Sequence, residues 1–130
     1  YIMLNLNGGE KCVSSTLLYS KVSYFSTFTP SSECSKDPCF VGEGTARLYA
    51  LNYLKGIAVF NFDAKNDSGG TVYARSDRAT VVGTAIPSGT VPAIIGGSTV
   101  TGYIGVGGGI YRAPLKYSKV IIPVYWKHVR

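Results

Sequence analysis

Three cysteines are the residues of this chain whose types and spacing suggest covalent chemistry. Cys34 and Cys39 enclose a short loop that a disulfide could close in an oxidising compartment. We therefore predict a Cys34–Cys39 disulfide, with free thiols as the alternative. Cys12 is then left over, and we expect it to pair with another chain or fragment, or to stay a buried free thiol. A zinc site needs four ligands, and the chain offers one distant histidine, His128, and no CxxC pair.

The loop at residues 63–69 contains Asp and Asn side chains whose oxygen atoms suit calcium. Asp63, Asn66 and Asp67 are the calcium candidates. A calcium loop places oxygen ligands at alternating positions, and here the middle position is Lys65, whose ammonium group opposes a cation. Asn, Asp and Gly are also the residues that tight turns require. We therefore expect a turn, with calcium as the alternative.

The remaining polar residues do not form a pattern typical of a catalytic site. The chain has one histidine and seven acidic residues spread among turns, without a Ser/His/Asp or paired-carboxylate arrangement. The glycine-rich run at 105–109 would suit a phosphate, but neither a helix pattern nor a Gly-Lys-Ser/Thr sequence follows it. A CxxCH motif for haem is also missing from the sequence. We predict a protein that is not an enzyme and that holds no organic cofactor.

The composition is typical of one small all-β module. The chain has 130 residues, of which 45% are hydrophobic, and it contains 16 glycines and 10 tyrosines. This length supports one domain. Many β-branched and aromatic residues between turn residues predict strands and essentially no helix. No run approaches the roughly 20 apolar residues that span a bilayer, so no membrane insertion is expected.

The net charge of +6 does not by itself indicate a nucleic-acid ligand. The thirteen basic residues are scattered, and their densest group is at residues 127–130. Scattered lysines favour solubility and protect strand edges, so no nucleic-acid partner is expected, while anionic surfaces and glycans stay open as partners. The chain starts at Tyr1 rather than Met and lacks an export signal. We expect a processed piece of a longer, exported precursor.

Alternation of apolar and polar residues predicts the strands that must position these side chains. Residues 44–62 are expected to form a hairpin that turns at Leu54-Lys55-Gly56. A second hairpin is expected at residues 16–28, with its turn at Ser20-Lys21. The four strands of these two hairpins predict a first antiparallel sheet within residues 1–62. A further short strand is expected at residues 2–4.

A second antiparallel sheet is expected within residues 71–130. Its strands are predicted at 71–74, 79–83, 91–95, 100–106 and 120–126. Gly96-Gly97 supplies a hairpin turn. In this register, six side chains should point between the sheets and form the core: Leu17, Phe25, Leu48, Ala50, Ile94 and Ile104.

Several short segments follow one another in a characteristic order. Phe28-Thr29-Pro30 precedes a cysteine-bearing loop, GTARLYALNY follows at residues 44–53, Ile86-Pro87-Ser88-Gly89 comes later, and Tyr125-Trp126-Lys127 lies near the end. In this order the chain resembles, over residues 10–130, the end of the C-terminal β-propeller domain of type IV pilus biogenesis and tip-adhesin proteins, the PilC/PilY family. LYAL alone also occurs in quinoprotein-type propellers.

The resemblance implies a fold of about two propeller blades, one at residues 1–62 and one at residues 71–130. It also implies an extracellular, pilus-associated role in pilus assembly, in the control of retraction or in surface attachment. Members of that family carry calcium-binding acidic loops, which is a further reason to test calcium here.

Two blades cannot close a ring, because propellers need about four to eight blades. Open strand edges would therefore seek a protein partner, namely the remaining blades, pilus subunits or further copies of the chain. Self-assembly of the fragment into an oligomer or extracellular filament is the alternative function. The aromatic residues expected at such an interface are Tyr1, Tyr111, Tyr117, Tyr125 and Trp126. For each tyrosine, cross-strand packing is the alternative role.

Overall fold

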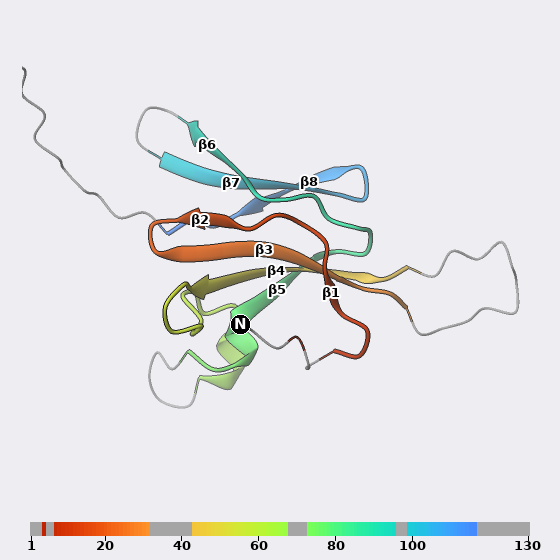
Figure 1. Ribbon diagram of the computed structural model, residues 1–130, viewed down its shortest axis with the longest axis horizontal. Coiled ribbons are helices and arrows are strands. Elements are labelled where there is room, and N and C mark those ends of the chain that lie inside the picture. Colours follow the sequence, from red (N-terminus) through yellow and green to blue (C-terminus); the bar gives the residue numbers. More distant parts are fainter. Residues whose placement is uncertain (1–3, 5–6, 32–42, 68–72, 96–98, 117–130) are drawn as a thin grey trace, which may run out of the picture.

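The computed structural model describes residues 4, 7–31, 43–67, 73–95 and 99–116. Within these ranges the chain forms two antiparallel β-sheets and two single-turn 3₁₀ helices (Figure 1). The prediction of an all-β protein built from antiparallel sheets is confirmed. Its division into propeller blades stays a prediction. No helix in the described ranges is long and apolar enough to cross a membrane.

The first sheet is an up-and-down meander. Its strands are β1 (Lys11–Cys12), β2 (Leu17–Tyr19), β3 (Val22–Thr29), β4 (Thr45–Asn52) and β5 (Ala79–Gly83). β1 and β2 pair with successive parts of one edge of β3, and β4 and β5 continue the sheet on the other side. Ser20 and Lys21 form the two-residue turn between β2 and β3, so the predicted hairpin is confirmed.

The second sheet contains β6 (Val91–Ile95), β7 (Thr99–Val106) and β8 (Gly109–Ala113) in that order. The antiparallel pairing of β6 with β7 was predicted, although Gly96-Gly97 lies outside the described residues. β8 was not predicted. Gly107 and Gly108 have φ angles of 57° and 78°, and a two-residue turn that joins twisted strands requires such positive values.

Two predicted features of the first sheet are wrong. The segment after the turn at residues 53–55 makes one isolated bridge, between Leu51 and Ala58, instead of the second arm of a hairpin. β3 occupies one edge of β4, and β5 occupies the other edge from Ala46 to Tyr49, so only the Leu51 end of that second edge is left for Ala58. β5, which was predicted in the second sheet, therefore belongs to the first.

The loop between β4 and β5 also differs from the prediction. It contains the 3₁₀ helices η1 (Ala64–Asn66) and η2 (Ser76–Arg78). Residues 73–74, the described part of the strand predicted at 71–74, are not in a strand. The strand predicted at residues 120–126, and all of the one at 2–4 except Leu4, lie outside the described residues.

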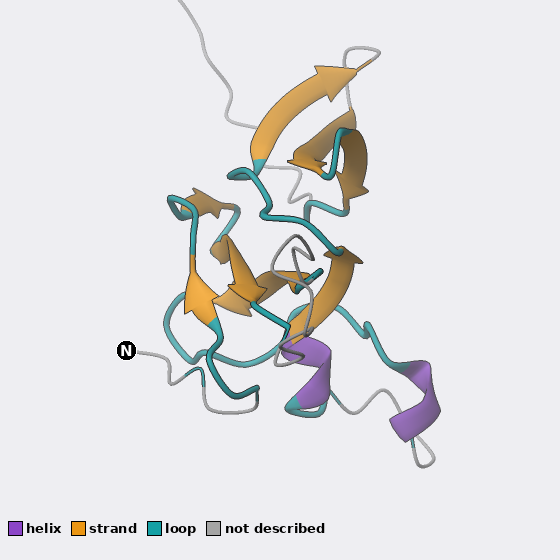
Figure 2. Ribbon diagram, turned by 90° about the vertical axis from the view of Figure 1, so that its right-hand side faces the viewer, coloured by secondary structure: helices purple, strands orange, loops and turns teal. Residues whose placement is uncertain are grey.

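One hydrophobic core lies between the two sheets, which stack on one another in the side view (Figure 2). The first sheet contributes Val22, Tyr24, Leu48 and Ala50, while Ile104, Ala113 and Leu115 come from the second sheet and the segment after it. A smaller cluster on the opposite face of the first sheet consists of Phe25, Tyr49 and Leu51. The rings of Phe25 and Tyr49 stack there with their centroids 5.0 Å apart.

The predicted core is mostly confirmed. Leu48, Ala50 and Ile104 are fully buried, and Leu17 is half-buried against the core. Phe25 is buried but faces away from the second sheet, because its register places it beside Tyr49. The prediction that Ile94 belongs to the core is wrong, because 72% of its surface is exposed. Among the described strands β6 has a neighbour on one side only, so its Ile94 end lies at an open margin.

Candidate functional site

Most of the site residues predicted from the sequence lie outside the described residues, namely Cys34, Cys39, Tyr117, Tyr125 and Trp126, together with Tyr1. The disulfide and the aromatic interface therefore stay predictions. Cys12 is described and is an exposed free thiol, which contradicts the buried alternative. Tyr111 is half-buried against the core between the sheets, so packing accounts for it.

The acidic loop is braced as a turn. Asp63 caps η1, since its Oδ1 accepts a hydrogen bond from the backbone N–H of Lys65 at 3.2 Å. Asp67 Oδ2 accepts a hydrogen bond from Asn61 Nδ2 at 2.5 Å. The side chain of Asn66 is not described. In the described ranges no three His, Cys, Asp or Glu side chains gather in a metal-binding group. Calcium at Asp63, Asn66 and Asp67 stays a prediction, which calcium titration would test.

A buried carboxylate braces the N-terminal segment against the outer face of the first sheet. Glu10 Oε1 accepts hydrogen bonds from Thr27 Oγ1 at 2.5 Å and from the hydroxyl of Tyr49 at 3.0 Å. Its Oε2 accepts one from Asn7 Nδ2 at 2.8 Å. Burial, reinforced by the neighbouring Glu10 carboxylate, raises the pKa of Tyr49 to about 12. Glu10 thus accepts three hydrogen bonds, and buried networks of this kind stabilise a fold.

The segments that carry the family resemblance meet at one end of the two sheets. Phe28, Gly44 and Ile86 line a hollow of about 700 Å³, together with Glu43, Thr84, Ala85 and Gly107. The ring of Phe28 lies where a Cβ atom on Gly44 would have to be, so only glycine fits there. Ser88 links the Ile86–Gly89 segment to β7, because its backbone N–H donates a hydrogen bond to the carbonyl of Gly105 at 2.8 Å.

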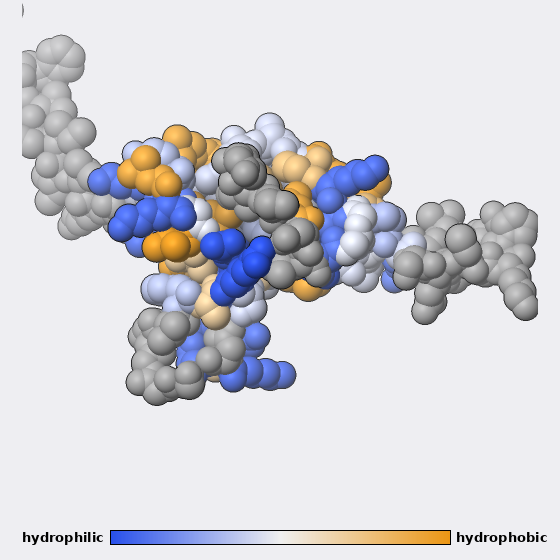
Figure 3. All heavy atoms as spheres, turned by 60° about the horizontal axis from the view of Figure 1, so that its bottom comes forward, coloured by the Kyte–Doolittle hydropathy of each residue, from blue (hydrophilic) through white to orange (hydrophobic). Residues whose placement is uncertain are grey.

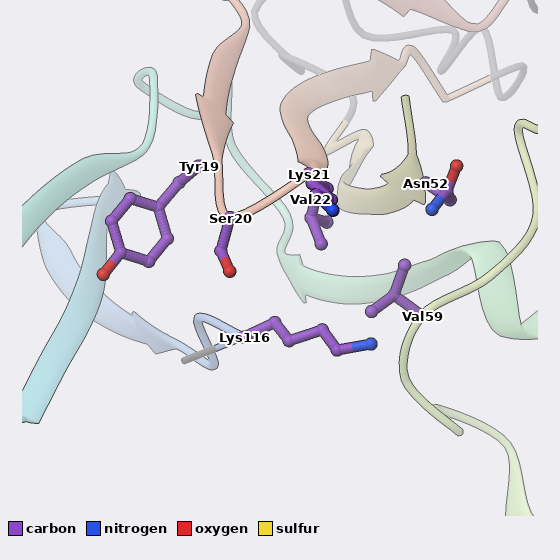
Figure 4. A pocket seen from close by; sticks show the side chains of 7 residues that line it. All are labelled: Tyr19, Ser20, Lys21, Val22, Asn52, Val59 and Lys116. Atoms are coloured by element: carbon purple, nitrogen blue, oxygen red, sulfur yellow. The ribbon is translucent and has the colours of Figure 1, made fainter. Parts of the chain in front are cut away.

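A cleft with several polar side chains lies at the opposite end of β3 and β4 (Figure 4). Its volume is about 420 Å³, and its described lining consists of Tyr19, Ser20, Lys21, Val22, Asn52, Val59 and Lys116. The turn between β2 and β3 forms one wall, the end of β4 forms another, and the segment after β8 supplies Lys116. Figure 4 shows the Lys116 side chain extending below Ser20 and toward Val59.

Hydrogen bonds fix the orientation of the Asn52 side chain. Its Oδ1 accepts hydrogen bonds from the backbone N–H groups of Leu54 and Lys55, at 3.0 and 3.1 Å. The amide oxygen is therefore occupied by the turn, and the Nδ2 group is the end that can donate to a ligand. Tyr19 and Ser20 add hydroxyl groups, and Lys21 and Lys116 add ammonium groups.

Lys116 is tied to the first sheet through its backbone. Its N–H donates a hydrogen bond to the hydroxyl of Tyr24 at 2.9 Å. Burial raises the pKa of the Tyr24 phenol above its usual value, the hydrogen bond from Lys116 opposes this shift, and the nearby Tyr19 reinforces it. The phenol is thus neutral at physiological pH, and the contact holds Lys116 beside the cleft.

Strain is concentrated at the turn that forms the wall of the cleft. Ser20 and Lys21 have φ angles of 49° and 64°, and they are the only non-glycine residues with positive φ in the described ranges. Left-handed backbone costs an L-residue about 1–2 kcal/mol, which is why Asn-Gly is the common pair in such turns. Sequence reasoning placed this turn but missed the cleft, because Lys116 reaches it only through the tertiary fold.

Hydrophilic and hydrophobic side chains are interspersed on the face of the molecule drawn in Figure 3. Large apolar residues with more than half of their surface exposed are found on β2 and β5, on two loops and in the second sheet. Comparison with known proteins adds nothing to these observations. No protein-family model, no curated protein and no solved structure matches the chain.

Proposed function

We propose that the chain is a non-enzymatic, extracellular module of a type IV pilus biogenesis or tip-adhesin protein, acting in pilus assembly or surface attachment. The ordered segments Phe28-Thr29-Pro30, LYAL at 48–51 and Ile86 to Gly89 suggest this role. In this proposal the first and second sheets are neighbouring blades of a propeller whose other blades belong to the parent protein.

The stacking of two up-and-down sheets is the observation that supports the proposal best. A propeller blade is typically a four-stranded antiparallel sheet, and neighbouring blades pack around a central channel. The first sheet is four strands wide where β1, β3, β4 and β5 lie side by side, and it shares a core with the second sheet. The Ile86–Gly89 segment connects the two sheets, between β5 and β6.

The second sheet presents apolar side chains that a further blade would cover. Val91 on β6 and Ile110 on β8 are 63% and 78% exposed. Val91 pairs with Tyr103, and Ile110 pairs with Gly105, so both apolar side chains lie on the face of the sheet turned away from Ile104. The partner we propose for this face is the remainder of the parent propeller, with pilus subunits as partners of the complete protein.

The test uses the parent protein in cells that produce it. Leu48→Asp places a charge in the core between the sheets, whereas Leu18→Asp changes a leucine that is 61% exposed. We expect the unmodified protein and Leu18→Asp in sheared pilus fractions, and we expect Leu48→Asp to be missing from them with fewer surface pili by electron microscopy. Pilus fractions that lack the unmodified polypeptide would contradict the proposal.

Self-assembly through open strand edges is the second candidate function, and the exposed Ile94 end of β6 favours it. Edge strands commonly carry lysine to prevent such pairing, so Ile94→Lys should block association. Light scattering of the 130-residue chain and of the variant measures this directly. A monomer at every concentration before substitution would exclude this candidate.

A further inference from the structure

We propose that the cleft lined by Tyr19, Ser20, Lys21, Asn52 and Lys116 binds a small carboxylated sugar, such as a uronic acid. This inference stands on the cleft itself and is independent of the proposed role in pili. It concerns the end of the two sheets opposite to the hollow in which the family-like segments meet.

The polar groups around the cleft are nearly all hydrogen-bond donors. None of the seven described lining residues is acidic. Lys21 and Lys116 carry ammonium groups, and the Asn52 amide presents its Nδ2 because its oxygen is occupied by two backbone N–H groups. Two positive charges, with no carboxylate among the described lining residues, favour an anion, since electrostatic complementarity governs such recognition.

The apolar part of the lining argues for an organic anion rather than for inorganic phosphate. Val59 contributes apolar surface, and Tyr19 contributes an aromatic ring. Small-molecule sites combine such surface with a few placed polar groups, in cavities of about 300–1,000 Å³. The volume of about 420 Å³ lies at the lower end of that range. One sugar ring offers a carboxylate, hydroxyl groups and a partly apolar face.

The residue types in the strained turn add a second argument, because a two-residue hairpin requires the left-handed conformation but does not require Ser and Lys there. Ser20 and Lys21 both occupy the left-handed region, at φ angles of 49° and 64°. Asn-Gly would relieve this strain, but it would also remove the hydroxyl and the ammonium group from the wall of the cleft. Strained backbone that persists in a site is typical of function, and stability is often sacrificed for it.

The experiment is a titration of the isotope-labelled 130-residue chain followed by NMR, with glucuronic acid as the probe. Glucose serves as the matched control, because it has a CH₂OH group where glucuronic acid has its carboxylate. We expect saturable shifts at residues 19–22 and 52 with glucuronic acid and a response at least about tenfold weaker with glucose. The glucuronic acid affinity should fall as salt is added.

Variants test the individual parts of the site. Lys21→Ala with Lys116→Ala should weaken glucuronic acid binding by about tenfold or more. Lys55→Ala removes the same charge from the neighbouring turn, outside the cleft lining, and should leave the affinity unchanged. Ser20→Asn with Lys21→Gly should raise the unfolding temperature by several degrees while weakening binding, which separates loss of the site from loss of the fold.

Three results would overturn the proposal. If glucose bound as tightly as glucuronic acid, Lys21 and Lys116 would not be recognising a carboxylate. Inorganic phosphate that binds the same residues as tightly as glucuronic acid would reduce the cleft to a bare anion site. Full affinity in the variant that carries Ser20→Asn and Lys21→Gly would show that the strained turn takes no part in binding.

Discussion

Tyr49 is the residue whose ionisation should be visible in the stability of the protein. Its pKa is raised to about 12, first by burial and then by the Glu10 carboxylate, whereas an unfolded tyrosine titrates near 10. The folded state therefore keeps a proton that the unfolded state loses. The stabilisation is complete below pH 10 and disappears as the pH rises from 10 to about 12.

We predict that Tyr49→Phe flattens this part of the pH profile. The free energy of unfolding of the unmodified chain should fall by about 2–3 kcal/mol more than that of the variant between pH 10 and 12. Urea unfolding at a series of pH values measures the difference. Tyr24→Phe is the control for the second buried phenol, whose pKa is also raised. Parallel profiles for the unmodified chain and Tyr49→Phe would contradict the assignment.

Asp77 holds together the loop that connects β4 and β5. It is fully buried, and its two oxygens accept hydrogen bonds from the backbone N–H groups of Asp63 at 2.8 Å and Ala74 at 2.7 Å. Asp77→Ala leaves both donors unpaired and should lower the free energy of unfolding by about 3 kcal/mol. Asp77→Asn keeps one acceptor oxygen, so its free energy of unfolding should lie between those of the unmodified chain and of Asp77→Ala. Equal urea midpoints for all three proteins would show that the loop is not braced by Asp77.

At the scale of elements, the positions of the strands could be predicted from the sequence better than which strands pair with each other. The alternation in β4 correctly separates Leu48 and Ala50 on one face from Tyr49 and Leu51 on the other, because the period of two is local. The pairing of β4 with β5 is not local. It depends on which segment reaches the free edge of β4 after a long loop, and no pattern within either strand encodes that choice.

The binding cleft could be predicted only in part, for the same reason. The Ser20-Lys21 turn follows from the hairpin pattern around it, but its positive φ angles and its neighbours do not. Lys116 comes near through a hydrogen bond between its backbone and Tyr24, which joins two distant segments. The turn at Gly107-Gly108 was missed because several adjacent glycines leave the position of a turn undefined in the sequence.

The hairpin of β7 and β8 allows a prediction with a close internal control. Gly108 has a φ angle of 78°, so Gly108→Ala should lower the free energy of unfolding by about 1–2 kcal/mol. Gly105 lies in the same hairpin, and a Cβ atom there would meet Ser88 Oγ at an ordinary 3.6 Å. Gly105→Ala should therefore change the stability little. Thermal unfolding compares the two, and equal losses would show that the turn conformation is not the cause.

At the scale of the molecule, the shared core predicts that the two sheets unfold together. Tyr24, Leu48 and Ala50 of the first sheet form one buried cluster with Ile104 and Ala113 of the second. Domains behave as cooperative units when their elements bury a common apolar core, whereas separate units open independently. The cooperative unit should thus include both sheets, in agreement with the single module expected from the sequence.

Ile104→Ala tests this coupling, because Ile104 is fully buried between the sheets. Removal of a buried isoleucine side chain should cost about 2–5 kcal/mol. If the sheets form one unit, hydrogen exchange should accelerate in β3 and β4 of the first sheet as much as in β7. Ile94→Ala, at a position that is 72% exposed, is the control and should leave all exchange rates nearly unchanged. Loss of a common core speeds the opening of both sheets at once. Faster exchange that is confined to β6, β7 and β8 would therefore show that the two sheets are stabilised separately.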